Sequence, residues 1–312
     1  MSVFVSDMAI QVRGLVKAFG GKTVVNGVDL DVPQGQVWGF LGPNGSGKTT
    51  TIRMMCGLLK PTGGSGKCLG YDILKSAAEI KRRTGYMTQK FSFWEDLSIR
   101  ENLMFVARMY DLPRKNAVVD ETLTKLGLTQ RQHQLAGALS GGWKQRLALA
   151  AVTMHAPKLL LLDEPTAGVD PQARREFWDE IHELASSGMT VLVSTHYMDE
   201  AERCDKIAYL AHGNLITQGR VQDVIDESRL VTFAASGADV RKHVQALTDI
   251  AGVDNASYFG SALHVSGTHR DLLEKAVNQP EFADLNWQEI KPDLEDVFIA
   301  LMRQAGVDAR KH

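Results

Sequence analysis

The sequence predicts an α/β fold built on a parallel sheet with a phosphate-binding loop at one end, and three observations support this prediction. Residues 42–50 read Gly-Pro-Asn-Gly-Ser-Gly-Lys-Thr-Thr, the spacing of a glycine-rich loop that cradles nucleotide phosphates. A buried strand is expected before the loop, at 36–41, and a helix after it, at 50–58. The apolar runs 158–162 and 190–195 are typical of strands buried on both faces of a parallel sheet. The alternative for the loop alone is a chance glycine-rich turn.

The residue types in the loop suit a nucleoside triphosphate. Glycines let successive backbone N–H groups turn toward one anion, and the positive end of the following helix adds to the attraction. We expect Lys48 to reach the β and γ phosphates and the Thr49 hydroxyl to complete the shell of a Mg²⁺ ion. The residues expected around the phosphates are Gly42, Pro43, Asn44, Gly45, Ser46, Gly47, Lys48, Thr49 and Thr50.

The composition fits a globular protein of two domains. The 312 residues are 44% hydrophobic and 23% charged. With a formal net charge of −2, the chain lacks the excess of positive charge that is typical of nucleic-acid-binding proteins, so no nucleic-acid partner is expected. The three cysteines lack metal-ligand spacing and are expected to be reduced thiols of a cytosolic protein. The sequence has neither the features of a secretory signal nor an apolar run long enough to cross a bilayer, so work at a membrane would need a partner.

A half-solvated antiparallel piece is expected ahead of the loop. Residues 9–15 and 27–32 alternate apolar and polar side chains, and Pro33 ends the second segment. Phe19 lies in the turn between them. Its ring could stack on a nucleotide base, but the residues alone favour a contribution to a small core.

Residues 98–150 are expected to be largely helical, with a break at Gly127. Ser98 and Glu101 have the spacing of a capping box, and helical apolar spacing follows them. The aromatic stretch 90–97 is either a small hydrophobic cluster or a docking surface for another protein.

A second candidate anion site opens a helix later in the chain. Ser140, Gly141 and Gly142 stand at this helix start, where their N–H groups and the helix dipole point the same way. A nucleotide bound at the phosphate loop is not expected to reach this helix start as well. The second site could therefore serve a nucleotide held by another molecule.

Polar side chains follow the two later strands. Asp163 and Glu164 come directly after the run 158–162, at the carboxyl end where open α/β sheets bind ligands. Asp163 would help to hold Mg²⁺, and Glu164 would polarise the water that attacks the γ-phosphate. His196 ends the run 190–195 and could donate a hydrogen bond to that phosphate. A solvated acidic strand end is the alternative for the two carboxylates.

With these residues assembled, the chain from 8 to 220 resembles the nucleotide-binding subunit of an ATP-binding cassette (ABC) transporter. The loop at 42–49 resembles the Walker A loop, 159–163 the Walker B strand and 139–143 the family signature. The resemblance implies an ABC-type P-loop NTPase fold with an antiparallel β subdomain and a helical subdomain at about 90–150. It also implies an ATPase that uses ATP and Mg²⁺.

The resemblance assigns roles to single residues. Glu164 matches the catalytic base, Gln89 the glutamine that senses Mg²⁺ and couples to the membrane partner, and His196 the switch histidine. Phe19 stands where the family places its adenine-stacking aromatic residue, which reverses the preference for core. We therefore expect the catalytic residues to be Glu164, His196, Lys48 and Gln89, the Mg²⁺ residues to be Thr49, Gln89 and Asp163, and the further nucleotide contacts to be Phe19, Ser140, Gly141, Gly142 and, in the D-loop, Asp170.

Two positions depart from the family pattern. Trp143 stands where most members have glutamine, and Phe19 where many have tyrosine. Phenylalanine keeps the stacking surface, and the serine and glycines of the signature remain, so hydrolysis is expected to survive. Our hypothesis is that Trp143 packs at the dimer interface or against the partner membrane domain.

The family's architecture implies partners. Two subunits meet head to tail, and Ser140 with Gly142 grips the γ-phosphate bound to the other subunit's Walker A loop. We expect a second ATPase subunit, as a homodimer or with a different chain, and an integral membrane permease on another chain. The expected location is cytoplasmic, peripheral on the inner face of the cell membrane.

Residues 221–312 are expected to form a separate α+β accessory domain. The predicted order is strand, helix, two strands, helix and strand, a ferredoxin-like module with helices at 239–250 and 269–277. The tail from Asp293 resembles the C-terminal element of ABC-2 export ATPases, which handle drugs, lipids or polysaccharides. The module is interpreted as regulatory or dimer-supporting, with passive packing as the alternative.

The expected function is therefore Mg-ATP hydrolysis that powers an ABC-2-type exporter. The alternative is a soluble cassette ATPase that acts on ribosomes or DNA. Translation factors of this superfamily usually carry two cassettes, whereas this chain has one Walker A loop. Chromosome proteins insert a long coiled coil, for which residues 50–138 are too few.

Overall fold

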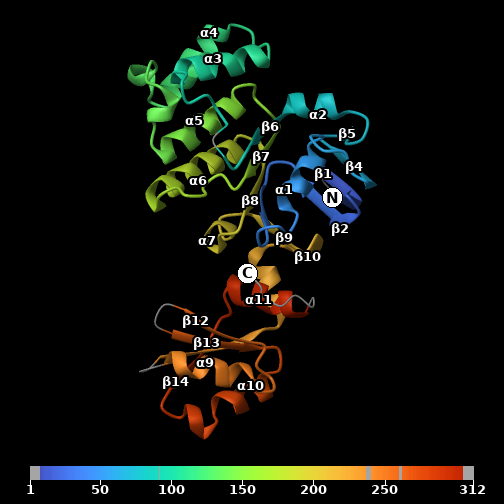
Figure 1. Ribbon diagram of the computed structural model, residues 1–312, viewed down its shortest axis with the longest axis vertical. Coiled ribbons are helices and arrows are strands. Elements are labelled where there is room, and N and C mark those ends of the chain that lie inside the picture. The colour runs from blue at the N-terminus through green and yellow to red at the C-terminus, as the bar shows by residue number, and fades with distance from the viewer. Residues whose placement is uncertain (1–7, 91, 237–239, 260–261, 305–312) are drawn as a thin grey trace, which may run out of the picture. The chain divides into compact units, whose positions relative to one another are not determined.

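The protein is described here from a computed structural model that covers residues 8–90, 92–236, 240–259 and 262–304. Its chain divides into two units, one up to Leu215 and one from Ile216 onward. Figure 1 shows the elements of both along the chain.

A six-stranded sheet has the order β10-β9-β3-β8-β7-β6; its strands β9 to β6 form the centre of the first unit, and its edge strand β10 runs across the boundary at Leu215. Neighbouring strands from β9 to β6 run parallel. Every residue of β3, β7 and β8 is buried, as their apolar runs predict. The strands are β3 (Val37–Leu41), β6 (Thr84–Met87), β7 (Leu159–Asp163), β8 (Thr190–Thr195), β9 (Lys206–Ala211) and β10 (Asn214–Gly219).

The predicted antiparallel piece is a four-stranded sheet in the order β2-β1-β4-β5. Its strands are β1 (Met8–Phe19), β2 (Lys22–Pro33), β4 (Gly63–Cys68) and β5 (Tyr71–Asp72). Alternate side chains of β1 and β2 enter a core that they share with β3 and with α1 (Lys48–Met55). This core anchors the helix that begins directly at the phosphate loop.

Helices α3 (Ile99–Met109) and α4 (Lys115–Lys125) pack with α5 (Gly141–Thr153) around a second core, which confirms the largely helical prediction. The Ser98 hydroxyl accepts a hydrogen bond from the Glu101 N–H, and the Glu101 carboxylate accepts one from the Ser98 N–H, so the capping box is present. Gly127 follows the end of α4 with a φ of 67°, at the predicted break. Of the aromatic stretch 90–97, Phe91 lies outside the described residues. The remaining elements of this unit are α2 (Ala77–Arg83), α6 (Pro171–Ser186), α7 (Met198–Ala201) and the 3₁₀ turns Thr129–Arg131 and Ala136–Ala138.

The second unit has the predicted ferredoxin-like order. Its antiparallel sheet runs β12-β13-β11-β14, so the first and third strands of the module lie at the centre. The strands are β11 (Val231–Ser236), β12 (Asn255–Phe259), β13 (Ala262–Gly267) and β14 (Asn286–Ile290), and the helices are α8 (Val221–Ser228), α9 (Val244–Thr248), α10 (Arg270–Val277) and α11 (Leu294–Gln304).

The helix predicted at 239–250 is shorter than expected. A 3₁₀ turn, Val240–His243, precedes α9, and another, Pro280–Phe282, follows α10. Residue 239 lies outside the described part of the chain. Across the described residues, we find no helix whose length and apolar character would let it cross a membrane.

Candidate nucleotide-binding site

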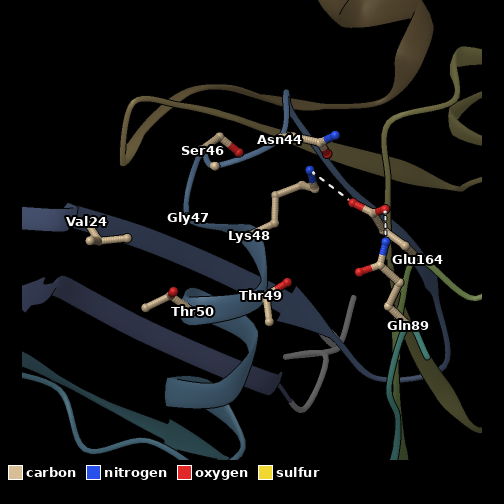
Figure 2. A pocket seen from close by; sticks show the side chains of 10 residues that line it. Val24, Asn44, Ser46, Gly47, Lys48, Thr49, Thr50, Gln89 and Glu164 are labelled. Atoms are coloured by element: carbon tan, nitrogen blue, oxygen red, sulfur yellow. Dashed lines mark hydrogen bonds and ion pairs between the residues drawn. The ribbon is translucent and has the colours of Figure 1, made fainter. Parts of the chain in front are cut away.

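The phosphate loop joins β3 to α1 and forms one wall of a pocket (Figure 2). Gly42 must be glycine, because its φ is 145° and an added Cβ would lie 2.0 Å from the Leu210 carbonyl oxygen. Gly47, with a φ of 102°, caps α1. The pocket is lined by Val24, Asn44, Gly45, Ser46, Gly47, Lys48, Thr49, Thr50, Gln89 and Glu164.

Lys48 lines this pocket and is buried. Its Nζ donates hydrogen bonds to the carbonyl oxygens of Gly42 at 2.7 Å and Pro43 at 3.2 Å, and it lies 3.5 Å from Glu164 Oε1. Burial lowers the pKa of Lys48, and the charge of Glu164 opposes that shift. The loop thus presents a desolvated cation beside a carboxylate.

The other three predicted catalytic side chains all lie close to the Glu164 carboxylate. Besides the Lys48 contact, Gln89 Nε2 donates to Glu164 Oε2 at 2.9 Å, and His196 Nδ1 lies 3.4 Å from the same oxygen. Figure 2 shows the Lys48 and Gln89 side chains directed at Glu164. Glu164 has a φ of 48°, a left-handed conformation that costs an ordinary residue about 1–3 kcal/mol. Backbone strain of this kind is concentrated at functional sites.

Asp163 ends β7 and is buried at the same end of the sheet. Its Oδ1 accepts hydrogen bonds from Thr49 Oγ1 at 2.9 Å and Ser194 Oγ at 2.8 Å. Its Oδ2 accepts one from the Tyr86 hydroxyl at 3.2 Å. A carboxylate and a threonine hydroxyl within 2.9 Å are hard oxygen donors of the kind that Mg²⁺ prefers, so the residues fit that ion.

Phe19 does not contribute to a core. Its side chain is 49% exposed at the end of β1, and Lys17 Nζ lies 4.9 Å from its ring centroid. The interpretation as core that the residues alone favoured is wrong, because β1 ends there and leaves the ring in solvent. The open aromatic face is suited to stacking.

The signature residues lie outside the pocket of the phosphate loop. Ser140 is the N-cap residue of α5, and Gly141 and Gly142 form its first turn. Asp170 caps α6 by accepting hydrogen bonds from two backbone N–H groups. Of these residues, Ser140, Gly142 and Asp170 line a separate pocket, and Gly141 is next to it in the chain. The pocket is lined by Ser140, Gly142, Trp143, Arg146, Asp170, Gln172, Ala173 and Glu176.

Trp143 is half-buried and packs against the helical core. The guanidinium groups of Arg146 and Arg131 lie 4.9 Å and 5.7 Å from its ring centroid. These contacts give the ring an intramolecular role at the start of α5.

Residues 25–167 match the sequence model of the family described as ABC transporter. The probable multidrug ABC transporter ATP-binding protein YbhF of Escherichia coli K12 is 42% identical over 224 residues, which cover 71% of this chain. Those residues cover 39% of YbhF, so the chain spans well under half of that relative. The Nod factor export ATP-binding protein I of Burkholderia lata is 35% identical over 309 residues, covering 94% of this chain and 96% of that protein. The chain belongs to the ABC transporter family of ATP-binding proteins.

A solved ABC structure agrees with the family's fold. CbiO1 of Clostridium perfringens, described as part of the ABC transporter complex CbiONQ, has a TM-score of 0.65 and 29% identity. The match covers 71% of this chain and 92% of CbiO1. The predicted resemblance and the predicted P-loop fold are therefore both confirmed.

Two hydroxyl residues of this ABC protein were not predicted from the sequence. Ser194 donates to Asp163 and accepts from the Glu164 N–H at 3.0 Å, so it joins the two carboxylate residues. Tyr86 joins Asp163 to Arg53, whose Nε donates to the Tyr86 hydroxyl at 3.1 Å, and burial raises the pKa of Tyr86 to about 12. The sequence feature that could have indicated both residues is a hydroxyl side chain near the carboxyl end of a strand. Both strands, β6 and β8, pair with β7, which ends at Asp163.

Proposed function

We propose that this chain is the ATP-binding and ATP-hydrolysing subunit that powers an ABC-2-type exporter through a separate membrane protein. The observation that carries the proposal is the position of Glu164. It stands at the end of a buried strand, beside the phosphate loop, with Lys48, Gln89 and His196 within 3.5 Å of its carboxylate oxygens. A carboxylate held there can accept a proton from a water in line with a γ-phosphate.

The chain's own groups divide the work of hydrolysis. The loop N–H groups and Lys48 bind the β and γ phosphates, and the exposed ring of Phe19 stacks on the adenine. Thr49, Asp163 and Gln89 would hold Mg²⁺, which supplies charge neutralisation on the phosphates when it is bound. Glu164 accepts the proton of the attacking water, and His196 donates a hydrogen bond to the γ-phosphate.

The second anion site supports a working dimer. Ser140, Gly141, Gly142 and Asp170 are distant enough from the phosphate loop to line or adjoin a different pocket. In a head-to-tail pair, this helix start would meet the γ-phosphate held by the other subunit. We therefore propose that the chain works with a second ATPase subunit, as a homodimer.

The names of the relatives favour transport over a soluble function on ribosomes or DNA. YbhF is named as a multidrug transporter protein and the B. lata relative as a Nod factor export protein. We propose a cytoplasmic location, peripheral on the inner face of the membrane, where the chain contacts a permease. Residues 8–220 would form the ATP-binding domain and residues 221–312 an accessory domain that regulates or supports the dimer.

The test is Glu164→Gln in the full chain, with Glu202→Gln, an exposed glutamate at the end of α7, as the control. Glu164→Gln should bind ATP, lose turnover by at least about 100-fold and accumulate as a dimer with ATP and Mg²⁺ on size exclusion. Normal turnover would remove Glu164 from the role of base. Copurification tests the partner: ribosomes or DNA on tagged protein, in place of an integral membrane protein, would contradict the transporter proposal.

A further inference from the structure

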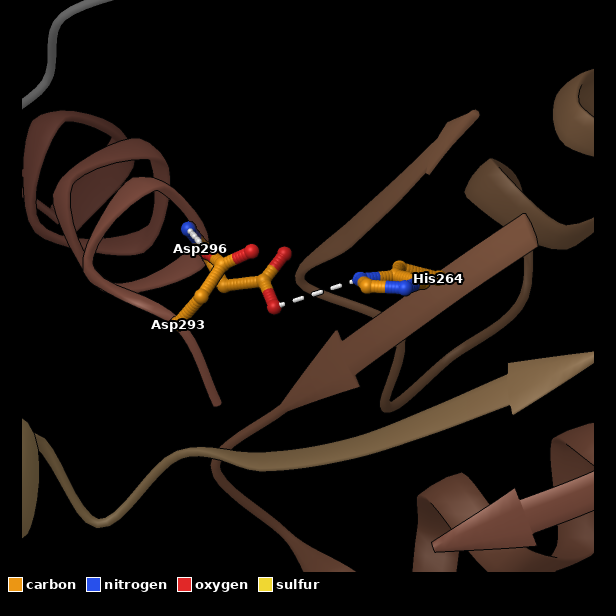
Figure 3. Close-up of side chains that lie close together, drawn as sticks. All are labelled: His264, Asp293 and Asp296. Atoms are coloured by element: carbon orange, nitrogen blue, oxygen red, sulfur yellow. Dashed lines mark hydrogen bonds and ion pairs between the residues drawn. The ribbon is translucent and has the colours of Figure 1, made fainter. Parts of the chain in front are cut away.

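Three potential metal ligands converge in the second unit, at the point where α11 begins beside β13. They are His264 on β13, Asp293 just before α11 and Asp296 in its first turn. One ligand atom from each lies within 4.8 Å of the other two. Figure 3 shows His264 and Asp296 facing each other across the gap between strand and helix.

Asp296 is an anionic side chain in an unusual environment. Its exposed fraction is 0%, and within the described residues neither of its carboxylate oxygens accepts a hydrogen bond. Burial raises the pKa of Asp296 to about 6; the neighbouring charge of Asp293 adds to this shift and His264 opposes it. A buried carboxylate is stable only when it is paired or bound to a metal. The His264 imidazole faces Asp296 and can either pair with it directly or share a metal ion with it.

The spacing of the ligand atoms suits an ion between them. His264 Nδ1 lies 3.6 Å from Asp296 Oδ2, which is longer than a hydrogen bond. Two ligands about 2.1 Å from a tetrahedral ion are separated by about 3.4 Å, close to this distance. Asp293 Oδ1 accepts a hydrogen bond from the Asp296 N–H at 2.7 Å, which holds the Asp293 side chain over the helix start.

We propose that His264, Asp293 and Asp296 form a binding site for a divalent transition-metal ion of the Zn²⁺ class. One imidazole nitrogen with two carboxylates favours Zn²⁺ over Mg²⁺ or Ca²⁺, which prefer oxygen ligands throughout. The His264 side chain is 14% exposed, so water can complete the coordination. The ion would fasten α11 to the sheet of the second unit. This site shares no residue with the proposed nucleotide site.

The experiment measures Zn²⁺ binding to the full chain by competition with a chromogenic chelator. Excess Mg²⁺ and a non-hydrolysable ATP analogue keep the phosphate-loop site occupied. The three cysteines are buried, and burial raises the pKa of each thiol, so they stay protonated and compete poorly. Co²⁺ serves as a second probe, since its visible absorption reports its ligands.

We expect one Zn²⁺ per chain for the natural sequence. His264→Gln and Asp296→Asn should each weaken binding by about 100-fold, because each replaces an imidazole nitrogen or a carboxylate with a neutral amide that binds Zn²⁺ poorly. The matched controls are His269→Gln and Asp271→Asn, exposed residues at the start of α10, which should bind Zn²⁺ like the natural chain. Zn²⁺ should raise the melting temperature of the natural chain and of both controls, and leave those of the two ligand variants unchanged.

Two results would overturn the site. One is a natural chain that binds no Zn²⁺, in which case the contact between His264 and Asp296 is a direct one without a metal ion. The other is Zn²⁺ binding of equal affinity in the ligand variants, provided that their circular dichroism matches that of the natural chain. Asp296→Asn removes a buried charge, so this variant should fold even if His264→Gln does not.

Discussion

Ser194 offers a direct test of how the two carboxylate residues are held at the end of the sheet. Its hydroxyl is fully buried, donates to Asp163 Oδ1 at 2.8 Å and accepts from the Glu164 N–H at 3.0 Å. In Ser194→Ala, the Glu164 N–H keeps its hydrogen bond to the Ser194 carbonyl oxygen at 3.1 Å, whereas Asp163 loses a donor. A hydrogen bond to a charged group contributes about 1.5–3 kcal/mol, so we expect the free energy of unfolding to fall by that amount.

The same change should affect Mg²⁺ more than ATP. Residues that orient a metal ligand typically change metal affinity by about 10–100-fold, so the Mg²⁺ concentration for half-maximal ATPase activity should rise within that range. Steady-state ATPase assays over a Mg²⁺ titration and urea unfolding measure the two effects. The control is Thr190→Val at the other end of β8, whose hydroxyl accepts a hydrogen bond from the Gly35 N–H at 3.0 Å. An unchanged Mg²⁺ dependence in Ser194→Ala, or an equal change in Thr190→Val, would refute this reasoning.

Further predictions concern other parts of the chain. Phe19→Ala should weaken ATP binding by about tenfold and Phe19→Tyr should not, because only the first removes the stacking face; equal affinities by calorimetry would exclude stacking. Trp143→Gln should lower the free energy of unfolding by about 1–2 kcal/mol through its lost arginine contacts, and unchanged ATPase and transport rates in this variant would exclude a role at a protein interface. Cys204 should react with a thiol reagent only on unfolding, because burial raises its pKa; rapid labelling of native protein would contradict this. Phe282→Ala, in the core of the second unit, should cost about 3–5 kcal/mol of stability, and a loss below 1 kcal/mol by urea unfolding would be inconsistent with its burial.

Local signals in the sequence were sufficient for much of the fold. The runs that became β7 and β8 are continuous and apolar, and the capping box at Ser98 needs only residues three apart. The ferredoxin-like module of the second unit was predicted from its alternation of strands and helices along the chain, and its sheet has the order β12-β13-β11-β14.

The contacts that local signals could not predict depend on strand order in the sheet. Ser194 reaches Asp163 because β8 lies beside β7 and the two residues are paired in register. Nothing within β8 indicates which strand will lie beside it, since an apolar run fits any central position. His264 and Asp296 likewise meet only when α11 packs beside the sheet. The exposure of Phe19 depended on where β1 ends, and strand ends are poorly encoded.

The contact between Lys48 and Glu164 turns phosphate binding into an exchange of counter-ions. The Lys48 ammonium already lies 3.5 Å from a carboxylate oxygen of Glu164. A γ-phosphate that binds Lys48 therefore replaces the carboxylate as the anion beside it. The contact with Glu164 therefore cancels much of the attraction that an unpaired buried cation would offer to a phosphate. The displaced carboxylate would then be free for the role we propose for it, which is to accept a proton from water. The group that we propose as the catalytic base would thus lower the affinity for the substrate. It follows that Glu164→Gln should bind ATP more tightly than the natural chain, independently of its loss of turnover.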